Sequence, residues 1–265
     1  MNHADAAAAL PGGWLLPLKG PAEPRLRVIV CPPAGGHPAA FRPLAGQLGP
    51  DVEVFGAHLP GRLGRLGEAP LRLLSEVVQG LAGALPSDGL PLVLLGHSFG
   101  AHVAYELVRH LSAAGEGGVA GIIVAASPAP GRARLREMAL HELPDDELVA
   151  ELRALGGVPD ALWEQRALVR RLLPGARADL EAFAVHRHRP GPRLSCPALV
   201  LAGDRDPLVP LASALAWADE LSRVRTVVLP AGHFLFEEAL EPALAAMRRH
   251  LDLCVPPLDH EGPTT

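Results

Sequence analysis

The 265-residue sequence lacks three features, each of which would point to a particular class of protein: paired cysteines, an excess of positive charge and a long apolar segment. Its three cysteines, Cys31, Cys196 and Cys254, are odd in number and show no paired spacing, so we expect reduced thiols. A net charge of −5 argues against nucleic-acid binding. No apolar run approaches the roughly 18 residues that a membrane span needs, and we expect no membrane association.

Targeting signals are equally scarce. The first ten residues contain no Lys or Arg before the Pro-Gly-Gly at 11–13, so we expect no secretory signal and a cytoplasmic protein. The composition is 49% hydrophobic, enough for a large core, and we predict a single domain over residues 1–265. The ends, residues 1–12 and 256–265, are rich in Ala, Pro and polar residues and are predicted to be disordered.

The sequence around Ser98 predicts a strand, a tight turn and a helix. Val93 to Leu95 form a short apolar run typical of a strand buried on both faces. Gly96-His97-Ser98-Phe99-Gly100 follows, and apolar residues then recur at helical spacing from Ala101. In a G-x-S-x-G turn between strand and helix, the serine is strained and exposed at the end of the sheet. We therefore predict Ser98 as a nucleophile.

Further strands and helices alternate along most of the chain. Apolar runs predict strands at 14–18, 27–31, 52–59, 121–126, 197–202 and 225–229, and helices at 41–48, 71–85 and 234–250. This rhythm stops at about 132–190, where leucines suggest helices split by Gly156-Gly157 and by Pro174-Gly175. We expect this inserted segment to be a lid over the site. The alternative is a helical subdomain that serves only packing.

The loop after the strand at 27–31 is small and Gly-rich, Pro32-Pro33-Ala34-Gly35-Gly36. Such a loop, placed directly after a central strand, supplies an oxyanion donor in folds of this kind. Pro33 has no N–H, so the donor is predicted to be the Ala34 backbone amide, paired with that of Phe99. The alternative is a plain strand–helix turn.

An acid and a base follow in the order Ser, Asp, His. Asp204 and Asp206 both come after the strand at 197–202. We choose Asp206, because Pro207 holds it in an extended conformation on the loop beyond the strand, with Asp204 as a structural residue. His233 lies just past the last predicted strand, 27 positions after Asp206, and is predicted to be the general base.

Other candidates are weaker. Arg62 and Arg65 have the right charge for an acidic or phosphate-bearing partner, but loop arginines are more often solvated, and we expect both to be so. His186 and His188 lack a nearby Cys or carboxylate in the sequence, so we expect surface residues and no metal site.

Over roughly nine-tenths of its length the chain resembles the discrete type II thioesterases that accompany polyketide synthases and non-ribosomal peptide synthetases, members of the α/β-hydrolase superfamily. The resemblance rests on CPPAGGHPAAF (31–41), LPGR (59–62), GHSFG (96–100), LLPGARADL (172–180), CPALVLAGDRDP (196–207) and PAGHF (230–234). Family members usually carry His or Tyr where Pro33 stands, so this chain lacks any side-chain contribution of that kind.

The resemblance implies an α/β-hydrolase fold, with a mostly parallel sheet flanked by helices. It also implies hydrolysis of acyl groups from the phosphopantetheine thioester of an acyl- or peptidyl-carrier protein, which removes stalled or aberrant units. The catalytic roles fall on Ser98, Asp206 and His233, the residues that the sequence selects. No cofactor is expected, and we expect a monomer. Two alternatives stay open: a carboxylesterase of small esters, and a non-catalytic α/β-hydrolase that binds a partner.

Overall fold

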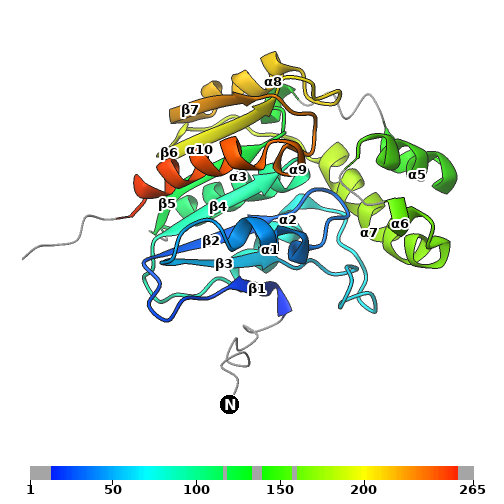
Figure 1. The fold of residues 1–265 in the computed structure, drawn as a ribbon, viewed down its shortest axis with the longest axis horizontal. Helices are drawn as coiled ribbons and strands as arrows, with labels where there is room; N and C mark the ends of the chain where they lie inside the picture. The colour runs from blue at the N-terminus through cyan, green and yellow to red at the C-terminus, as the bar shows by residue number, and fades with distance from the viewer. Residues whose placement is uncertain (1–12, 116–117, 133–138, 157–159, 256–265) are drawn as a thin grey trace, which may run out of the picture.

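A single sheet organises the residues that the computed structural model describes, which are 13–115, 118–132, 139–156 and 160–255. Its strand order is β1-β3-β2-β4-β5-β6-β7, and only the edge pair β1–β3 is antiparallel (Figure 1). The strands are β1 (Leu15–Lys19), β2 (Leu26–Cys31), β3 (Val52–Ala57), β4 (Leu92–His97), β5 (Val119–Ala125), β6 (Leu194–Gly203) and β7 (Leu221–Leu229). The expected mostly parallel α/β architecture is confirmed. The predicted tails, 1–12 and 256–265, lie outside the described residues.

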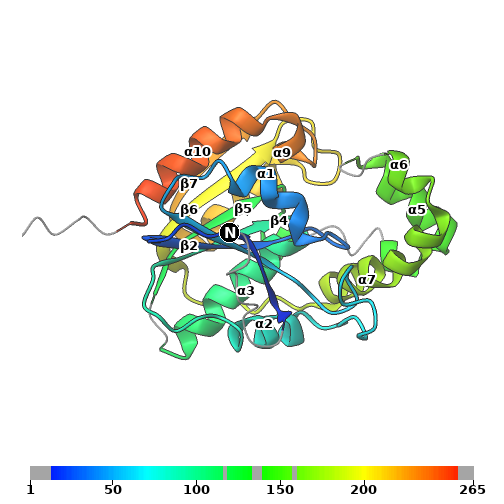
Figure 2. The same cartoon turned by 60° about the horizontal axis from the view of Figure 1, so that its bottom comes forward.

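The central strands are apolar on both faces because helices cover both faces (Figure 2). On one face Ile29, Leu94 and Ile122 pack with α2 (Leu74–Ala82) and α3 (Phe99–Ala113). On the other face Val28 and Val93 pack with α1 (Arg42–Ala45), α9 (Leu235–Glu238) and α10 (Leu240–Asp252). The predicted helices at 71–85 and 234–250 are thus present but shorter or divided. The one at 41–48 is a turn of 3-10 helix, η2 (Pro38–Phe41), followed by α1.

The helical segment between β5 and β6 extends beyond these two layers at one side of the sheet, although the end of α7 packs with α2 and α3 (Figures 1 and 2). Its described elements are η3 (Pro130–Arg132), η4 (Leu140–Glu142), α5 (Asp145–Ala154), α6 (Asp160–Trp163) and α7 (Arg166–Val185). The predicted division at Gly156-Gly157 falls partly on residues outside the described ones. Between β6 and β7 lie α8 (Leu211–Leu215) and η5 (Ala216–Asp219).

The predicted break at Pro174-Gly175 is wrong, because α7 continues through both residues. Pro174 deprives the helix of one N–H donor, yet it lies on the exposed side, where water can satisfy the freed carbonyl. Gly175 is buried instead. A Cβ at Gly175 would overlap the guanidinium of Arg62 and lie 2.9 Å from the Gly61 carbonyl oxygen. This glycine allows a close approach of α7 to the loop after β3.

Two expectations from the sequence, on membrane spans and on cysteines, can be compared with the described part of the chain. None of its helices combines the length and the apolarity that crossing a membrane requires. Its three cysteines are unpaired, with Cys31 and Cys254 buried and Cys196 partly buried.

Candidate active site

Ser98 occupies a strained turn between β4 and α3. Its backbone has φ 55° and ψ −118°, in the region that residues other than glycine rarely adopt. The flanking glycines make the turn possible. A Cβ at Gly96 would overlap the Gly100 carbonyl, and a Cβ at Gly100 would overlap the Cys31 carbonyl of β2. The turn holds Ser98 at the N-terminus of α3, where helix N–H groups lack intrahelical partners.

A hydrogen-bonded chain joins Ser98 to residues from two other loops. His233 Nε2 lies 3.0 Å from Ser98 Oγ, and His233 Nδ1 lies 2.8 Å from Asp206 Oδ2. Because a carboxylate only accepts, Nδ1–H donates to Asp206, which leaves Nε2 as the acceptor for the Ser98 hydroxyl. The His233 and Asp206 side chains are buried, with 3% and 1% of their surface exposed. The structure therefore brings the three predicted residues together.

The two oxygens of Asp206 have separate partners. Oδ2 faces His233, whereas Oδ1 accepts hydrogen bonds from the backbone amides of Leu208 (2.9 Å) and Val209 (3.1 Å). These bonds orient the carboxylate within its own loop. Asp204, the competing aspartate, has half of its side chain exposed and lies 3.6 Å from Arg205. Only Asp206 of the pair is in contact with the imidazole.

His97 adds a contact that the sequence analysis did not select. Its Nε2–H donates to the His233 carbonyl oxygen over 2.9 Å, and its ring lies 5.6 Å from the His233 ring, centroid to centroid. Burial lowers the pKa of His97 to about 3, so its ring is neutral at pH 7. His97 thus fixes the backbone of the loop that carries His233. Its place directly before Ser98 in the motif was the available signal.

The loop after β2 lies beside the nucleophile turn. Phe99 is the first residue of α3, so its N–H has no acceptor within the helix. Pro33, Ala34 and Gly35 line a pocket together with His97 and Phe234, the neighbours of Ser98 and His233 in the sequence. In the described part of the chain, no backbone carbonyl accepts the Ala34 N–H. Among the described residues, the amides of Ala34 and Phe99 thus both lack a backbone acceptor.

The expectation that Arg62 and Arg65 are solvated is wrong. Arg62 is 3% exposed and pairs with Asp179 of α7, a residue that the sequence analysis did not select. Arg65 has 10% of its side chain exposed and donates to Glu68 (2.7 Å) and to the His58 carbonyl (2.6 Å). Both guanidinium groups satisfy acceptors inside the protein. Burial raises the pKa of the Asp179 carboxyl, and the Arg62 cation and the Gly35 amide oppose that shift.

His186 and His188 are also less exposed than expected. His186 Nε2 lies 3.2 Å from Glu106 Oε1, and His188 Nε2 lies 3.1 Å from Glu220 Oε1. The segment after α7 packs back onto α3, where Arg109 donates to the Arg189 carbonyl over 2.7 Å. The two histidines face different carboxylates. No group of three or more metal-ligating side chains was found among the described residues.

A pocket of about 350 Å³ lies between the loop after β2 and the helical segment. The sheet side contributes the loop 33–36 with Phe41, His97 and Phe234, and Arg62 and Glu237 are the charged residues that line the pocket. The helical segment supplies apolar side chains: Leu152, Leu155, Leu162, Trp163, Leu168, Val169, Leu172, Leu173 and Ala176. An apolar pocket of this kind, lined by the sequence neighbours of Ser98 and His233, suits an acyl chain.

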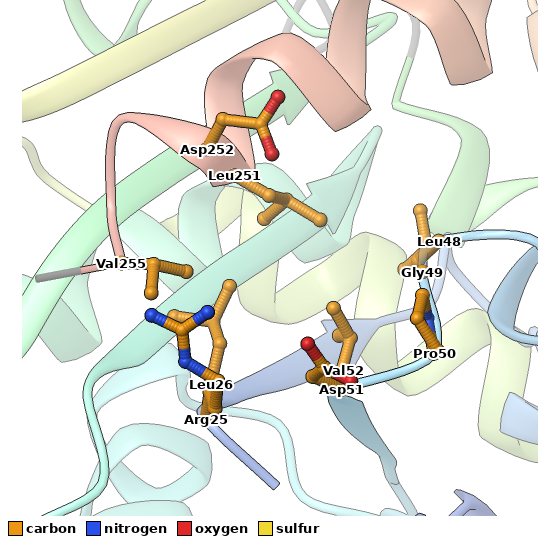
Figure 3. A pocket seen from close by; sticks show the side chains of 10 residues that line it. All are labelled: Arg25, Leu26, Leu48, Gly49, Pro50, Asp51, Val52, Leu251, Asp252 and Val255. Atoms are coloured by element: carbon orange, nitrogen blue, oxygen red, sulfur yellow. The ribbon is translucent and has the colours of Figure 1, made fainter. Parts of the chain in front are cut away.

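A second hollow, of about 330 Å³, lies at the amino ends of β2 and β3, beside the end of α10 (Figure 3). Arg25, Asp51 and Asp252 supply its charged side chains. None of the residues that line it lines the pocket near Ser98.

A nucleophile turn followed by an Asp loop and a His loop, on a mostly parallel sheet, defines the class: a serine hydrolase of the α/β-hydrolase fold. Comparison with known proteins narrows this class. Residues 26–251 match the thioesterase domain family, and the chain therefore belongs to the thioesterases, with the type II enzymes of polyketide and non-ribosomal peptide pathways among its relatives.

Three relatives illustrate the similarity. The thioesterase PikA5 of Streptomyces venezuelae is 33% identical over 209 residues, which cover 78% of this chain and 73% of PikA5. The gramicidin S biosynthesis protein GrsT of Aneurinibacillus migulanus is 28% identical over 92% of this chain and 96% of GrsT. The structure of the type II thioesterase BorB from the borrelidin cluster superimposes with a TM-score of 0.81 at 36% identity, covering 90% of this chain and 97% of BorB. The protein is accordingly a hydrolase of thioesters.

Proposed function

We propose that Ser98, His233 and Asp206 form the catalytic triad of a thioesterase that removes acyl groups from the phosphopantetheine arm of acyl- or peptidyl-carrier proteins. The observation that carries this proposal is the hydrogen-bonded chain from Asp206 through His233 to Ser98, with distances of 2.8 and 3.0 Å. The similarity to enzymes of polyketide and non-ribosomal peptide pathways supports the carrier-bound substrate.

The reaction proceeds through an acyl-serine. His233 Nε2 takes the Ser98 proton as Oγ attacks the thioester carbonyl, and Asp206 holds the Nδ1–H tautomer and stabilises the imidazolium. The Ala34 and Phe99 amides donate to the tetrahedral oxyanion, each contributing on the order of 3 kcal/mol to the transition state. The thiol leaves with the proton from His233, and water activated by the same imidazole then releases the acid.

The helical segment at about 132–190 acts as a lid that gives the pocket its apolar wall. With this wall, a straight alkyl acyl group is buried beside Ser98, while the phosphopantetheine arm enters from outside. The protein works without a cofactor, as a monomer in the cytoplasm, on acyl units that would otherwise block a synthase.

The test compares two substrates with one acyl group: an acyl-carrier protein thioester and the matching p-nitrophenyl ester. Wild type should have the higher kcat/KM on the carrier, and Ser98→Ala should abolish turnover of both. Ser112→Ala, an exposed serine on α3, serves as the matched control and should behave as wild type. Equal or better turnover of the free ester would favour a general carboxylesterase. Absence of turnover by the wild type, together with carrier binding, would favour a non-catalytic binding protein.

A further inference from the structure

Two motifs of the sequence, LPGR at 59–62 and LLPGARADL at 172–180, meet inside the protein. Arg62 follows β3 and Asp179 lies on α7, and the side chain of each is 3% exposed. Arg62 Nη2 donates to Asp179 Oδ2 across 117 positions of sequence. Gly175, one turn before Asp179, leaves room for this guanidinium. A buried carboxylate requires such a partner.

The same oxygen of Asp179 has a second donor, in the loop beside Ser98. Gly35 N–H donates to Asp179 Oδ2 over 2.8 Å. A Cβ on Gly35 would lie 2.6 Å from the Cβ of Ala176, so this loop packs directly on α7. One carboxylate oxygen on α7 therefore connects Arg62 to the backbone of the loop after β2.

The loop itself is a turn. Gly36 N–H donates to the Pro33 carbonyl over 2.8 Å, and Gly35 has φ +72°, the sign that a type II turn requires at its third residue. Types I and II differ in the orientation of the peptide unit between the second and third residues, here Ala34–Gly35. Glycine tolerates either sign of φ, so the turn has no strong preference of its own at this position.

We propose that Asp179 is a positioning residue: its hydrogen bond to Gly35 N–H anchors the turn 33–36, and the anchored turn keeps the adjoining Pro33–Ala34 peptide unit, which carries the Ala34 amide, directed at the oxyanion. The Ala34 N–H shares a peptide plane with the Pro33 carbonyl, which the Gly36 amide binds. Asp179 binds the next plane through Gly35 N–H. With both planes held, the backbone at Ala34 has one conformation. Arg62 favours the charged form of the carboxylate and aligns it, and its contribution is indirect.

This inference rests on the proposed role of the Ala34 amide, and it separates two properties of Asp179. Its negative charge balances Arg62, whereas its oxygen accepts Gly35 N–H. Only the second property concerns catalysis. Removing Asp179 alone would leave a buried cation and disturb folding, so the test removes both charges together.

The test compares Arg62→Met/Asp179→Leu with Arg62→Met/Asp179→Asn. Neither double variant has the ion pair, but asparagine retains an acceptor oxygen for Gly35 N–H. Loss of one oxyanion donor lowers kcat by about 100- to 1,000-fold, so a misaligned donor should lower kcat of the leucine variant by about 10- to 100-fold. KM should change little. The asparagine variant should recover most of kcat, and a trifluoromethyl ketone analogue, whose serine adduct carries an oxyanion, should bind the leucine variant more weakly by the same factor.

Two controls keep the result interpretable. Arg27 is a buried arginine at the other end of β2, paired with Glu53 and Asp88, so Arg27→Met/Glu53→Leu loses a comparable ion pair and should lower Tm with kcat intact. A chain with glycolate in place of Gly35 loses the N–H donor but retains the Arg62–Asp179 pair. It should show the same kcat loss as the leucine variant, and it serves if that variant fails to fold.

Equal kcat in the leucine and asparagine variants, or an unaffected kcat in the glycolate chain, would overturn the inference. The same kcat loss in the Arg27 control would also overturn it, because the effect would then be one of general stability. A failure of the proposed function gives another result, because Ser98→Ala would then retain turnover of the thioester.

Discussion

Asp206→Asn is the substitution that tests the proposed catalytic arrangement most directly. The change replaces one oxygen of the carboxylate by an NH₂ group and keeps the size of the side chain. Asp206 has two kinds of partner, the imidazole on Oδ2 and the amides of Leu208 and Val209 on Oδ1. An asparagine has only one acceptor oxygen for both.

The loop decides which way the amide turns. With its oxygen toward Leu208 and Val209, the asparagine keeps two hydrogen bonds, and its NH₂ group faces His233 Nδ1. The reverse orientation would set NH₂ against two N–H donors, and buried unsatisfied donors cost about 1–3 kcal/mol each. The first orientation therefore prevails. Nδ1 must then accept, so the proton moves to Nε2, where it faces the Ser98 hydroxyl and can no longer take its proton.

Because the substitution leaves the fold in place and selects the wrong tautomer, we expect kcat to fall about 10⁴-fold, or about 5.5 kcal/mol of transition-state stabilisation. The assay is steady-state hydrolysis of an acyl-N-acetylcysteamine thioester, with urea unfolding to show that stability is retained. Asp204→Asn, at the exposed neighbour, is the matched control and should retain wild-type kcat. A loss of less than about tenfold in Asp206→Asn would refute the tautomer argument.

Three further predictions use other parts of the molecule. Burial lowers the pKa of His102 from 6.5 to about 3, so between these pH values the unfolded chain binds a proton that the native state does not, and the free energy of unfolding falls as the pH drops from about 6.5 toward 3. In His102→Gln the slope of unfolding free energy against pH, measured by urea titrations, should be smaller by about 1.4 kcal/mol per pH unit, and an unchanged slope would contradict the burial argument. For thioesters of increasing acyl-chain length, kcat/KM should rise about fourfold per CH₂ until the pocket is full, and Leu172→Asp should reduce this dependence. If kcat/KM of the wild type does not change with chain length, the pocket does not bind the acyl chain. Gly175→Ala should destabilise by about 1–3 kcal/mol because its Cβ meets Arg62 and Gly61, whereas helix propensity alone predicts a gain of about 1 kcal/mol.

The sheet and the positions around Ser98 could be predicted because their signals are local. Each buried strand is a continuous apolar run, and in a parallel sheet the residues after the strands meet at one edge. Ser98, Asp206 and His233 each follow a strand, so their order and placement could be derived without knowledge of the contacts. The choice of Asp206 over Asp204 rested on Pro207, and the contact with His233 depends on how the loop turns through Leu208 and Val209.

Contacts between distant segments could not be predicted in the same way. Loop arginines are usually solvated, and nothing near Arg62 in the sequence reveals the carboxylate 117 positions away. The available signal was on α7, where Val169, Leu173 and Ala176 are buried at helical spacing and Asp179 continues that stripe. A carboxylate in an apolar stripe requires a partner, and a buried cation is the usual one.

Because α7 continues through Pro174-Gly175, a single helix contacts both the pocket and the loop after β2. One face of this helix lines the pocket proposed to take the acyl chain through Val169, Leu173 and Ala176, and one turn later Asp179 binds the loop that carries the Ala34 amide. A movement of α7 away from the sheet would break the Gly35 hydrogen bond and expose the Arg62 ion pair to water. Because of these two contacts, we expect α7 to stay in place as a wall of the proposed site. If the proposed lid opens to admit an acyl chain, we expect the described elements before α7 to move, because they can do so without breaking the hydrogen bond between Gly35 and Asp179.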